Sequence, residues 1–209
     1  MPDLQPLNAR FEQTGRVWLR NAISAEDLHR FDEVANLHDR PGQRLSNAET
    51  LAKLMSECSS LSQAISQLAA DARHVRADAF NKSDSANWGV PWHQDRVIAL
   101  AERHDVSGYG NWSRKSGTWH CEPPLSFLQQ MLFVRVHLDP STEDNGAMQI
   151  AVGSHRACLV SASQAEQEAH LHPIETCEAE RGDVLILKML ILHASKPATV
   201  PSSRRAIRL

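Results

Sequence analysis

Hydrophobic positions recur every three or four residues in the first third of the chain, a spacing that predicts amphipathic helices. Leu28, Phe31 and Val34 form one apolar face. Ser24 supplies a helix N-cap before this run, and Asp27 occupies the capping-box position. Further helical runs are predicted over residues 48–55 and 61–72.

After residue 75 the pattern changes to short segments with the alternation of strands. In residues 131–138, every second side chain, from Leu132 to Leu138, is apolar and lies on one face. Turn signals such as Asn145-Gly146 separate these segments. Helices followed by many short strands favour an antiparallel sandwich or barrel with helices outside, and a double-sheet jelly roll fits this length. The other apolar segments lie at residues 147–152, 184–187, 190–193 and 204–209.

The chain is expected to form one domain over residues 1–209, with residues 1–75 as mainly helical support and residues 76–209 as the core. A polar insertion interrupts this core at about residues 103–124. Long loops in compact domains are usually lids or binding loops. The alternative is a surface insertion whose tryptophans pack on the sheet, and the sequence leaves both interpretations open. Candidate substrate-lining residues are Trp88, Trp112, Trp119 and His155, the last of which is otherwise a turn residue.

Composition narrows the function classes. The chain has 22 Lys and Arg against 25 Asp and Glu, for a net charge of −3, which argues against a dedicated nucleic-acid binder. Its most apolar stretch, residues 184–192, is far shorter than the ~20 residues that a membrane helix needs. The N-terminus shows no apolar leader, and the four cysteines lack CxxC spacing. These features predict a cytoplasmic protein with reduced thiols. The sequence does not indicate the oligomeric state.

The sharpest chemical feature is Trp92-His93-Gln94-Asp95. On a strand, His93 and Asp95 point to the same side and Gln94 points away. The best candidate for a third ligand is His193, which follows the apolar residues 190–192. Two histidines and one carboxylate form the facial triad of non-heme Fe(II) oxygenases. Such a triad leaves positions on the metal for a 2-oxo acid and O₂.

The residues after His193 strengthen this interpretation. Arg204 follows His193 by eleven residues, so a chain reversal would return it beside the metal. Its planar guanidinium could bind the distal carboxylate of 2-oxoglutarate in bidentate fashion. Ser195 shares a strand face with His193 and could add a hydrogen bond. Arg205 faces the opposite side of the strand, and the eleven-residue offset favours Arg204.

The chain resembles the phytanoyl-CoA dioxygenase family of Fe(II)- and 2-oxoglutarate-dependent oxygenases from about residue 76 to its end. Each motif is modest, but their order and spacing together are specific. The motifs are Ala79-Phe80-Asn81-Lys82, Asn87-Trp88-Gly89-Val90-Pro91-Trp92-His93-Gln94-Asp95, Trp119-His120-Cys121-Glu122-Pro123-Pro124, Arg135-Val136-His137-Leu138-Asp139, Asn145-Gly146-Ala147-Met148, Gly153-Ser154-His155-Arg156, Gly182-Asp183-Val184-Leu185, His193-Ala194-Ser195 and Arg204-Arg205-Ala206.

The resemblance implies a mainly β fold with flanking helices: a double-stranded β-helix, the cupin-like jelly roll, with the N-terminal helices on the outer sheet. It implies oxidative decarboxylation of 2-oxoglutarate to succinate and CO₂, coupled to hydroxylation of a small organic molecule by O₂. The implied site residues are His93, Asp95 and His193 for Fe(II), Arg204 with Ser195 for 2-oxoglutarate, and Lys82 and Asn87 near the cosubstrate.

Two other interpretations stay open. One is a cupin-like metalloenzyme that does not use 2-oxoglutarate, against which Arg204 and Ser195 speak. The other is a non-catalytic ligand-binding protein on the same scaffold, which would not require three metal ligands and an arginine. Zinc could also occupy a site with two histidines and one carboxylate. In each case the expected partner is a small molecule rather than a nucleic acid or a membrane.

Overall fold

The computed structural model describes residues 6–35, 40–45, 48–115, 117–200 and 203–209. Helices dominate the first third of these, as the apolar periodicity predicts. The third predicted run ends early, at Leu68 rather than residue 72, because the backbone becomes extended at Ala69 (φ −159°, ψ 86°). The helices are α1 (Leu7–Thr14), α2 (Ala25–Ala35), α3 (Ala48–Glu57), α4 (Ser59–Leu68), α5 (Leu125–Gln130), the 3-10 helix η1 (Ser154–Ala157) and α6 (Ala165–Ala169).

Helix α2 begins at the predicted cap. The Asp27 backbone N–H donates to Ser24 Oγ at 3.1 Å, and the Ser24 hydroxyl donates to the Asp27 carboxylate at 2.8 Å. The first bond satisfies one of the backbone donors that a helix start leaves unpaired, and the second holds the two side chains together. The apolar face of α2 then buries Leu28 and Phe31 against the sheet.

The largest sheet has six antiparallel strands in the order β1-β11-β8-β13-β3-β2. Its centre combines strands far apart in the sequence, since β13 lies between β8 and β3. The strands are β1 (Arg16–Leu19), β2 (Gly42–Arg44), β3 (Asp78–Lys82), β8 (Leu132–His137), β11 (Val184–Lys188) and β13 (Arg204–Arg208).

The second sheet has four antiparallel strands in the order β10-β9-β12-β4. One predicted strand is shifted here: residues 190–192 are buried but lie outside any strand, and β12 begins only at His193. The strands are β4 (Val90–His93), β9 (Met148–Ala151), β10 (Ile174–Thr176) and β12 (His193–Ser195).

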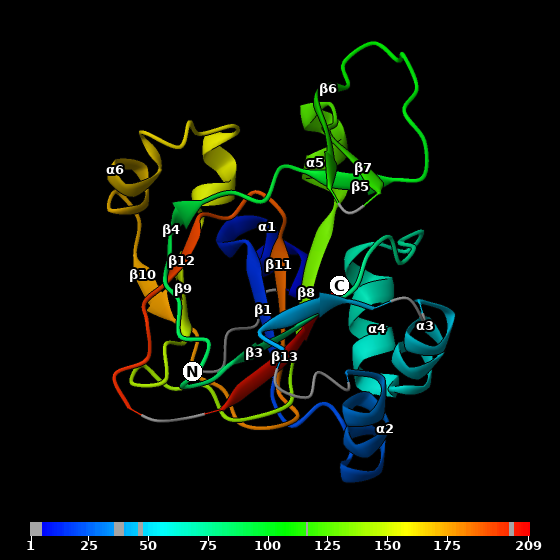
Figure 1. The fold of residues 1–209 in the computed structure, drawn as a ribbon, viewed down its shortest axis with the longest axis vertical. Coiled ribbons are helices and arrows are strands. Elements are labelled where there is room, and N and C mark those ends of the chain that lie inside the picture. Colours follow the sequence, from blue (N-terminus) through cyan, green and yellow to red (C-terminus); the bar gives the residue numbers. More distant parts are fainter. Residues whose placement is uncertain (1–5, 36–39, 46–47, 116, 201–202) are drawn as a thin grey trace.

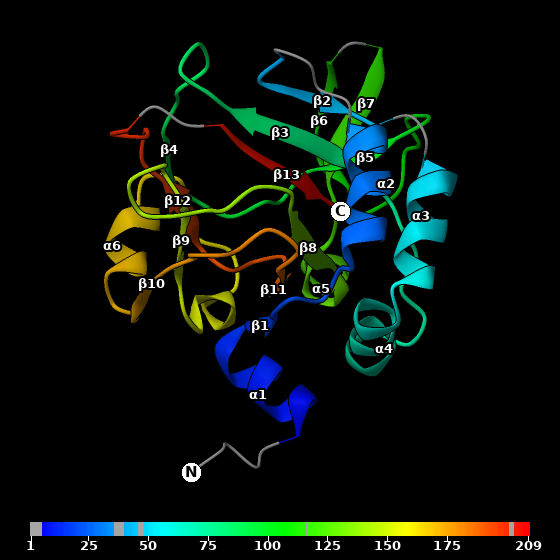
Figure 2. The same cartoon turned by 90° about the horizontal axis from the view of Figure 1, so that it is seen from below.

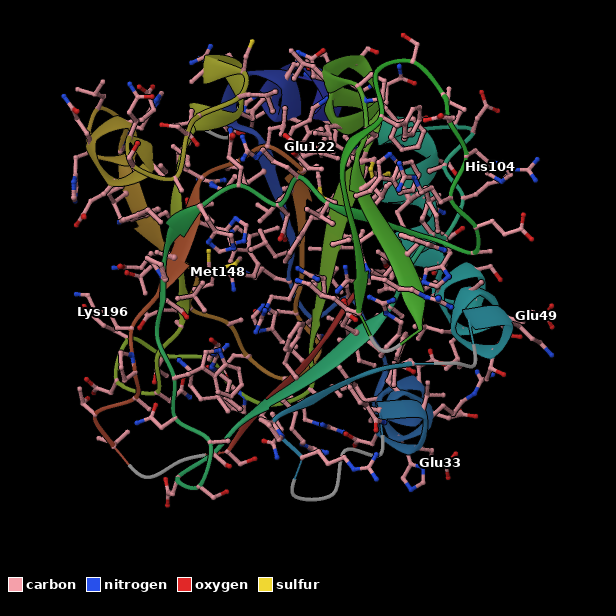
Figure 3. The ribbon with its side chains drawn as sticks, turned by 45° about the horizontal axis from the view of Figure 1, so that its top comes forward. Glu33, Glu49, His104, Glu122, Met148 and Lys196 are labelled. Atoms are coloured by element: carbon pink, nitrogen blue, oxygen red, sulfur yellow. The ribbon has the colours of Figure 1, made fainter. Side chains whose placement is uncertain are left out.

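Part of the polar insertion forms a third, small sheet rather than a loop. It has the order β5-β7-β6, with bounds Ile98–Leu100, Thr118–Glu122 and Gly110–Lys115. Trp112 and Trp119 pack edge to face within it, with ring centroids 6.3 Å apart. His104, in the loop between β5 and β6, points away from the body of the molecule (Figure 3).

The two larger sheets face each other, and helices α2, α3 and α4 cover the outer face of the six-stranded sheet (Figures 1 and 2). Alternation along β8 divides its side chains between these layers. Val134 and Val136 pack with the helices, as predicted, whereas Phe133 packs between the sheets. Met148 of the second sheet meets Phe133 in that inner core and lies near the middle of the molecule in Figure 3. The arrangement is a double-stranded β-helix with helices on its outer sheet.

All four cysteines are free, and Cys58, Cys121 and Cys177 are buried. In the described part of the chain, none of the helices has the length and apolar character needed to cross a bilayer.

Candidate metal and cosubstrate site

His93, Asp95 and His193 come together between the sheets. His93 ends β4, His193 begins β12, and the two residues are direct partners in the antiparallel pairing of these strands. Their ring centroids lie 4.2 Å apart, and His193 Nε2 lies 3.7 Å from Asp95 Oδ2. One ligand atom from each of the three residues lies within 4.8 Å of the others. This geometry can hold one divalent metal ion.

Backbone carbonyls orient both rings. Nδ1 of His93 lies 2.9 Å from the Pro91 carbonyl oxygen, and Nδ1 of His193 lies 3.0 Å from that of Ile191. When each Nδ1–H donates to its carbonyl, each Nε2 keeps its lone pair for a metal. Burial also lowers the pKa of His193 to about 4. The unprotonated ring is therefore the stable form near neutral pH.

Asp95 reaches the site from outside a strand, which differs from the simple alternation expected. Strand β4 ends at His93, and the buried Gln94 side chain leaves the sheet in another direction. Its amide donates to the carbonyls of Cys158 (2.7 Å) and Leu190 (2.8 Å), and Val160 N–H donates to its Oε1 at 2.9 Å. Gln94 thus ties the segment that carries Asp95, between β4 and β5, to two other loops.

Arg208 holds the Asp95 carboxylate. Its Nη1 lies 2.7 Å from Asp95 Oδ2, and its Nη2 lies 2.9 Å from Asp78 Oδ2. Burial alone would raise the pKa of Asp95, but His193 and Arg208 outweigh it and lower that pKa. Sequence reasoning gave Arg208 no role. The signal was present, because Arg208 shares a strand face with Arg204.

Arg204 lies on the inner face of β13 with only 6% of its surface exposed. Its Nε donates to the Asn145 carbonyl at 3.3 Å, and its Nη1 is buried without a hydrogen-bond partner. Burial lowers its pKa to about 10. Arg205 faces the other way and pairs with Asp139 (2.7 Å) and Asp32 (2.9 Å). Of the two neighbouring arginines, Arg204 alone points a free donor into the interior.

Two more buried cations accompany Arg204. Lys82, the register partner of Arg204 on β3, donates to the Lys196 carbonyl at 2.6 Å, and burial lowers its pKa to about 8. Arg135 on β8 has a buried Nε without a partner, and burial lowers its pKa to about 9. Among the described residues, no carboxylate forms an ion pair with any of these three cations. Buried charge of one sign calls for a bound counter-charge, so this region fits an organic anion.

Arg135 was also given no role from the sequence, although it sits in a quoted motif. Its charge in an alternating apolar strand was the available signal. His137, two residues along the same face, has both ring nitrogens buried without partners. Burial and the nearby Arg135 hold its pKa well below the usual range. The inner face of β8 is thus unusually polar for a core strand.

The two other residues predicted to contact the cosubstrate, Ser195 and Asn87, are not among the buried cations. Ser195 ends β12 and is half-buried, with Met148 and Val90 as its strand partners. Asn87 instead forms two hydrogen bonds with the loop after β12. Its amide donates to the Ala198 carbonyl at 2.9 Å, and Ala198 N–H donates to its Oδ1 at 2.7 Å. In this structure Asn87 fixes a loop rather than pointing into the cationic region.

The predicted substrate-lining residues mostly lie elsewhere. A cavity of about 460 Å³ opens beside Asp95 and Arg208, and its lining includes none of the four candidates. Trp112 and Trp119 pack in the small sheet, where Arg103 lies over both rings at 5.6 and 6.0 Å.

The other two candidates make contacts in separate parts of the fold. His155 contacts α1 through a 3.0 Å bond between its Nε2 and the Glu12 carbonyl. Trp88 stands 5.7 Å from Lys82 Nζ, at the cationic end of the site. His155 is thus a structural contact in this structure, and Trp88 lies near the cationic region rather than in the cavity.

Comparison with known proteins identifies the family of this chain. The family described as phytanoyl-CoA dioxygenase (PhyH) matches residues 9–206. No curated protein matches the sequence significantly.

Solved structures with the same fold share little sequence with this chain. EctD from S. alaskensis with 2-oxoglutarate and 5-hydroxyectoine is similar with a TM-score of 0.71 and 18% identity, over 97% of this chain and 73% of that one. HygX from Streptomyces hygroscopicus with nickel and 2-oxoglutarate bound is similar with a TM-score of 0.65 and 14% identity, over 99% and 85%. The epimerase SnoN from nogalamycin biosynthesis is similar with a TM-score of 0.63 and 15% identity, over 97% of this chain and 80% of that one.

Proposed function

Because the chain belongs to the phytanoyl-CoA dioxygenase family, an Fe(II)- and 2-oxoglutarate-dependent group of oxidoreductases, we propose that it hydroxylates a small organic molecule. In the same reaction 2-oxoglutarate is converted to succinate and CO₂, and O₂ is the oxidant. One observation carries the proposal. Three metal-ligand atoms lie within 4.8 Å of one another in the same interior as Arg204, a buried arginine with an unpartnered donor.

The donor set fits Fe(II). Two imidazoles and one carboxylate form the facial set that non-heme Fe(II) oxygenases use, with positions left open for other ligands. His93, Asp95 and His193 would hold the ion. When bound, Fe(II) supplies the redox chemistry that side chains lack, the reduction of O₂ with electrons from 2-oxoglutarate and from the substrate. Arg208 would keep the Asp95 carboxylate oriented.

The chain's own cations account for cosubstrate binding. Arg204 offers a buried guanidinium to the distal carboxylate of 2-oxoglutarate, and Lys82 stands beside it as register partner. Arg135 adds a third positive charge to this interior. A low-dielectric setting strengthens charge pairing and excludes water. These residues bind and orient the dicarboxylate. None of them needs to transfer a proton.

An anaerobic titration tests this function. Metal-free protein receives Fe(II) and then 2-oxoglutarate while its visible absorption is followed. We expect a charge-transfer band that requires both additions. In Arg204→Met, the 2-oxoglutarate concentration needed for the band should rise about thirtyfold or more, since losing one partner of a buried charge pair costs about 2–5 kcal/mol.

Arg205→Met is the matched control, because Arg205 faces the opposite side of the same strand. Equal shifts in the two variants would contradict the assignment of Arg204. Iron binding without any band would favour a metalloenzyme that does not use 2-oxoglutarate. Absence of iron binding would favour a non-catalytic scaffold.

A further inference from the structure

The cavity beside Asp95 is lined mainly by apolar side chains. It runs from the metal-ligand cluster past the ends of β8 and β13 to helices α3 and α4. Three of the chain's five methionines line it, and methionine side chains adapt readily to the shape of apolar ligands. The apolar lining includes Met55, Ile65, Phe133, Met131, Met189 and Leu209.

Exposed apolar side chains gather at this cavity. Val75 (57% exposed), Val97 (44%) and Phe127 (40%) all line it, although such residues are normally buried. Each comes from a different segment of the chain. Convergent exposed apolar groups around a hollow are typical of a ligand-binding mouth rather than of ordinary surface.

The cavity meets the reaction site at the end of β13 opposite to Arg204 and Lys82, and Arg135 is the register partner of Arg208 on β8. Asp95 and Arg208 belong to its lining, whereas Lys82, Arg135 and Arg204 do not. Arg204 and Arg208 lie four residues apart on β13, which separates their backbones by about 13 Å. A molecule in the cavity would therefore approach the metal ligands without occupying the place of 2-oxoglutarate.

The charges around the cavity are mostly positive. Among the described lining residues, Asp95 has the one acidic side chain, and Arg208 pairs with it. Arg73 is exposed and forms no ion pair or hydrogen bond with any described residue, and Nε2 of His74 is buried without a partner there. Arg76 is the remaining basic residue and pairs with Asp78 at 2.6 Å. Arg73 and His74 can therefore receive an anionic group at the rim.

From this lining we infer that the cavity binds the substrate, and that the substrate is a largely apolar organic molecule whose anionic group lies toward Arg73 and His74. The inference rests on the proposed function, because it identifies the occupant as what the oxygenase hydroxylates. The apolar part would lie against Met131, Phe133 and Met189, next to Asp95.

Two fluorescent probes test the cavity without iron or 2-oxoglutarate. They are 1-anilinonaphthalene-8-sulfonate, an apolar anion, and N-phenyl-1-naphthylamine, its neutral counterpart. Val75→Glu combined with Phe127→Glu should weaken binding of the anionic probe about tenfold or more, because a carboxylate would then face an apolar anion. The matched control is Val106→Glu with Leu159→Glu. These positions are 53% and 44% exposed and do not line the cavity.

Arg73→Gln should remove the preference for the anionic probe while leaving the neutral probe bound. The exposed Arg40, changed to Gln, is its control because it lies outside the lining. Equal loss in cavity and control variants would overturn the inference. So would a cavity variant that changes the oligomeric state, because the surface would then be an interface between copies of the chain.

Turnover completes the test. Apolar carboxylic acids, but not their neutral amides, should stimulate succinate release, and the Val75/Phe127 variant should lose this stimulation while keeping the Fe(II)–2-oxoglutarate band. A normal band with no stimulation by any apolar acid would overturn the substrate assignment alone. A missing band in the unaltered protein would instead overturn the proposed function.

Discussion

At the scale of single residues, the site is defined by buried groups that lack partners. Among the residues that the structure describes, Arg135 and Arg204 each keep a buried nitrogen without a hydrogen bond, and the one hydrogen bond of the Lys82 ammonium goes to a backbone carbonyl. Groups of this kind destabilise a protein and are typically kept for function. By contrast, Arg205 is fully engaged with carboxylates on the outer side of the same strand. This difference between neighbours supports the proposal that Arg204 binds the cosubstrate.

If Lys82 binds the cosubstrate as proposed, its ammonium is expected to make that binding depend on pH. Burial lowers its pKa to about 8, with Arg204 and Arg135 adding to the effect. Lys82 is charged below that pH and neutral above it, and a dicarboxylate binds the charged form better. Affinity for 2-oxoglutarate should therefore fall as pH rises through about 8, by a slope approaching about tenfold per pH unit.

Calorimetric titration of the metal-free protein with 2-oxoglutarate measures this slope and keeps the metal ligands' protonation out of the readout. Lys82→Arg should flatten the profile because arginine stays charged throughout. An unchanged slope in that variant would refute the role of Lys82.

At the scale of elements, the site depends on where strands stop. Strand β4 ends at His93, so its hydrogen bonds to β12 stop there. Beyond that point the Gln94 side chain forms hydrogen bonds to the loops at Cys158, Val160 and Leu190. Strand register fixes the positions of His93 and His193, whereas Asp95 lies on an irregular segment that the Gln94 hydrogen bonds hold in place. The position of Asp95 should therefore be the one most affected when those bonds are lost.

Gln94→Leu tests this clamp. It would leave two carbonyls and one N–H without their partner, which costs about 1–3 kcal/mol for each buried group left unsatisfied. We expect a lower free energy of unfolding in denaturant and weaker Fe(II) binding, although all three ligands remain. Gln149→Leu is the control, because Gln149 makes a single long side-chain contact of 3.5 Å with Thr176. Unaltered Fe(II) affinity in Gln94→Leu would show that other contacts hold the segment that carries Asp95.

At the scale of the whole molecule, the space between the two large sheets is divided into two ends. Lys82 and Arg204 lie at one end, and the apolar cavity opens at the other, beside Arg208 and its register partner Arg135. His93, Asp95 and His193 lie between the sheets. The single-domain organisation over residues 1–209 and the cytoplasmic location stay predictions. Helices α2 to α4 cover the outer face of the six-stranded sheet (Figure 2). Residues of α3 and α4 also line the cavity, so the N-terminal third contributes to the site as well as to support.

Lys82, Arg135 and Arg204 repel one another, so we expect each charge to lower the stability of the ligand-free protein while it strengthens 2-oxoglutarate binding. Arg135→Met removes a buried charge without a partner, so it should stabilise the ligand-free protein by about 1 kcal/mol or more. The same change should reduce the rise in thermal midpoint that 2-oxoglutarate produces in the unaltered protein. Thermal unfolding with and without 2-oxoglutarate measures both effects, with the exposed Arg40→Met as control. A destabilised Arg135→Met with full 2-oxoglutarate response would contradict this account.

The pattern of neighbouring residues in the sequence was enough to predict several elements of this protein and its family. The three-residue spacing and Ser24 cap predicted α2, alternation predicted β8, and the ordered motifs indicated the family and its jelly roll. The same motifs named the three residues that now lie within 4.8 Å of one another, and the offset from His193 distinguished Arg204 from Arg205. These features succeed because helical and strand periodicities, and the spacing within one strand, are properties of consecutive residues.

Only the tertiary structure decided the rest. The polar insertion became a small sheet, Trp112 and Trp119 packed on each other, and the cavity formed from segments that share no motif. Arg208 acquires a role only when the fold brings Asp78 and Asp95 beside it, and Arg135 only when β8 pairs with β13. A spacing rule can indicate which side of its own strand a residue faces. Which other elements will face it depends on how the sheets close, and that is set by packing across the whole molecule.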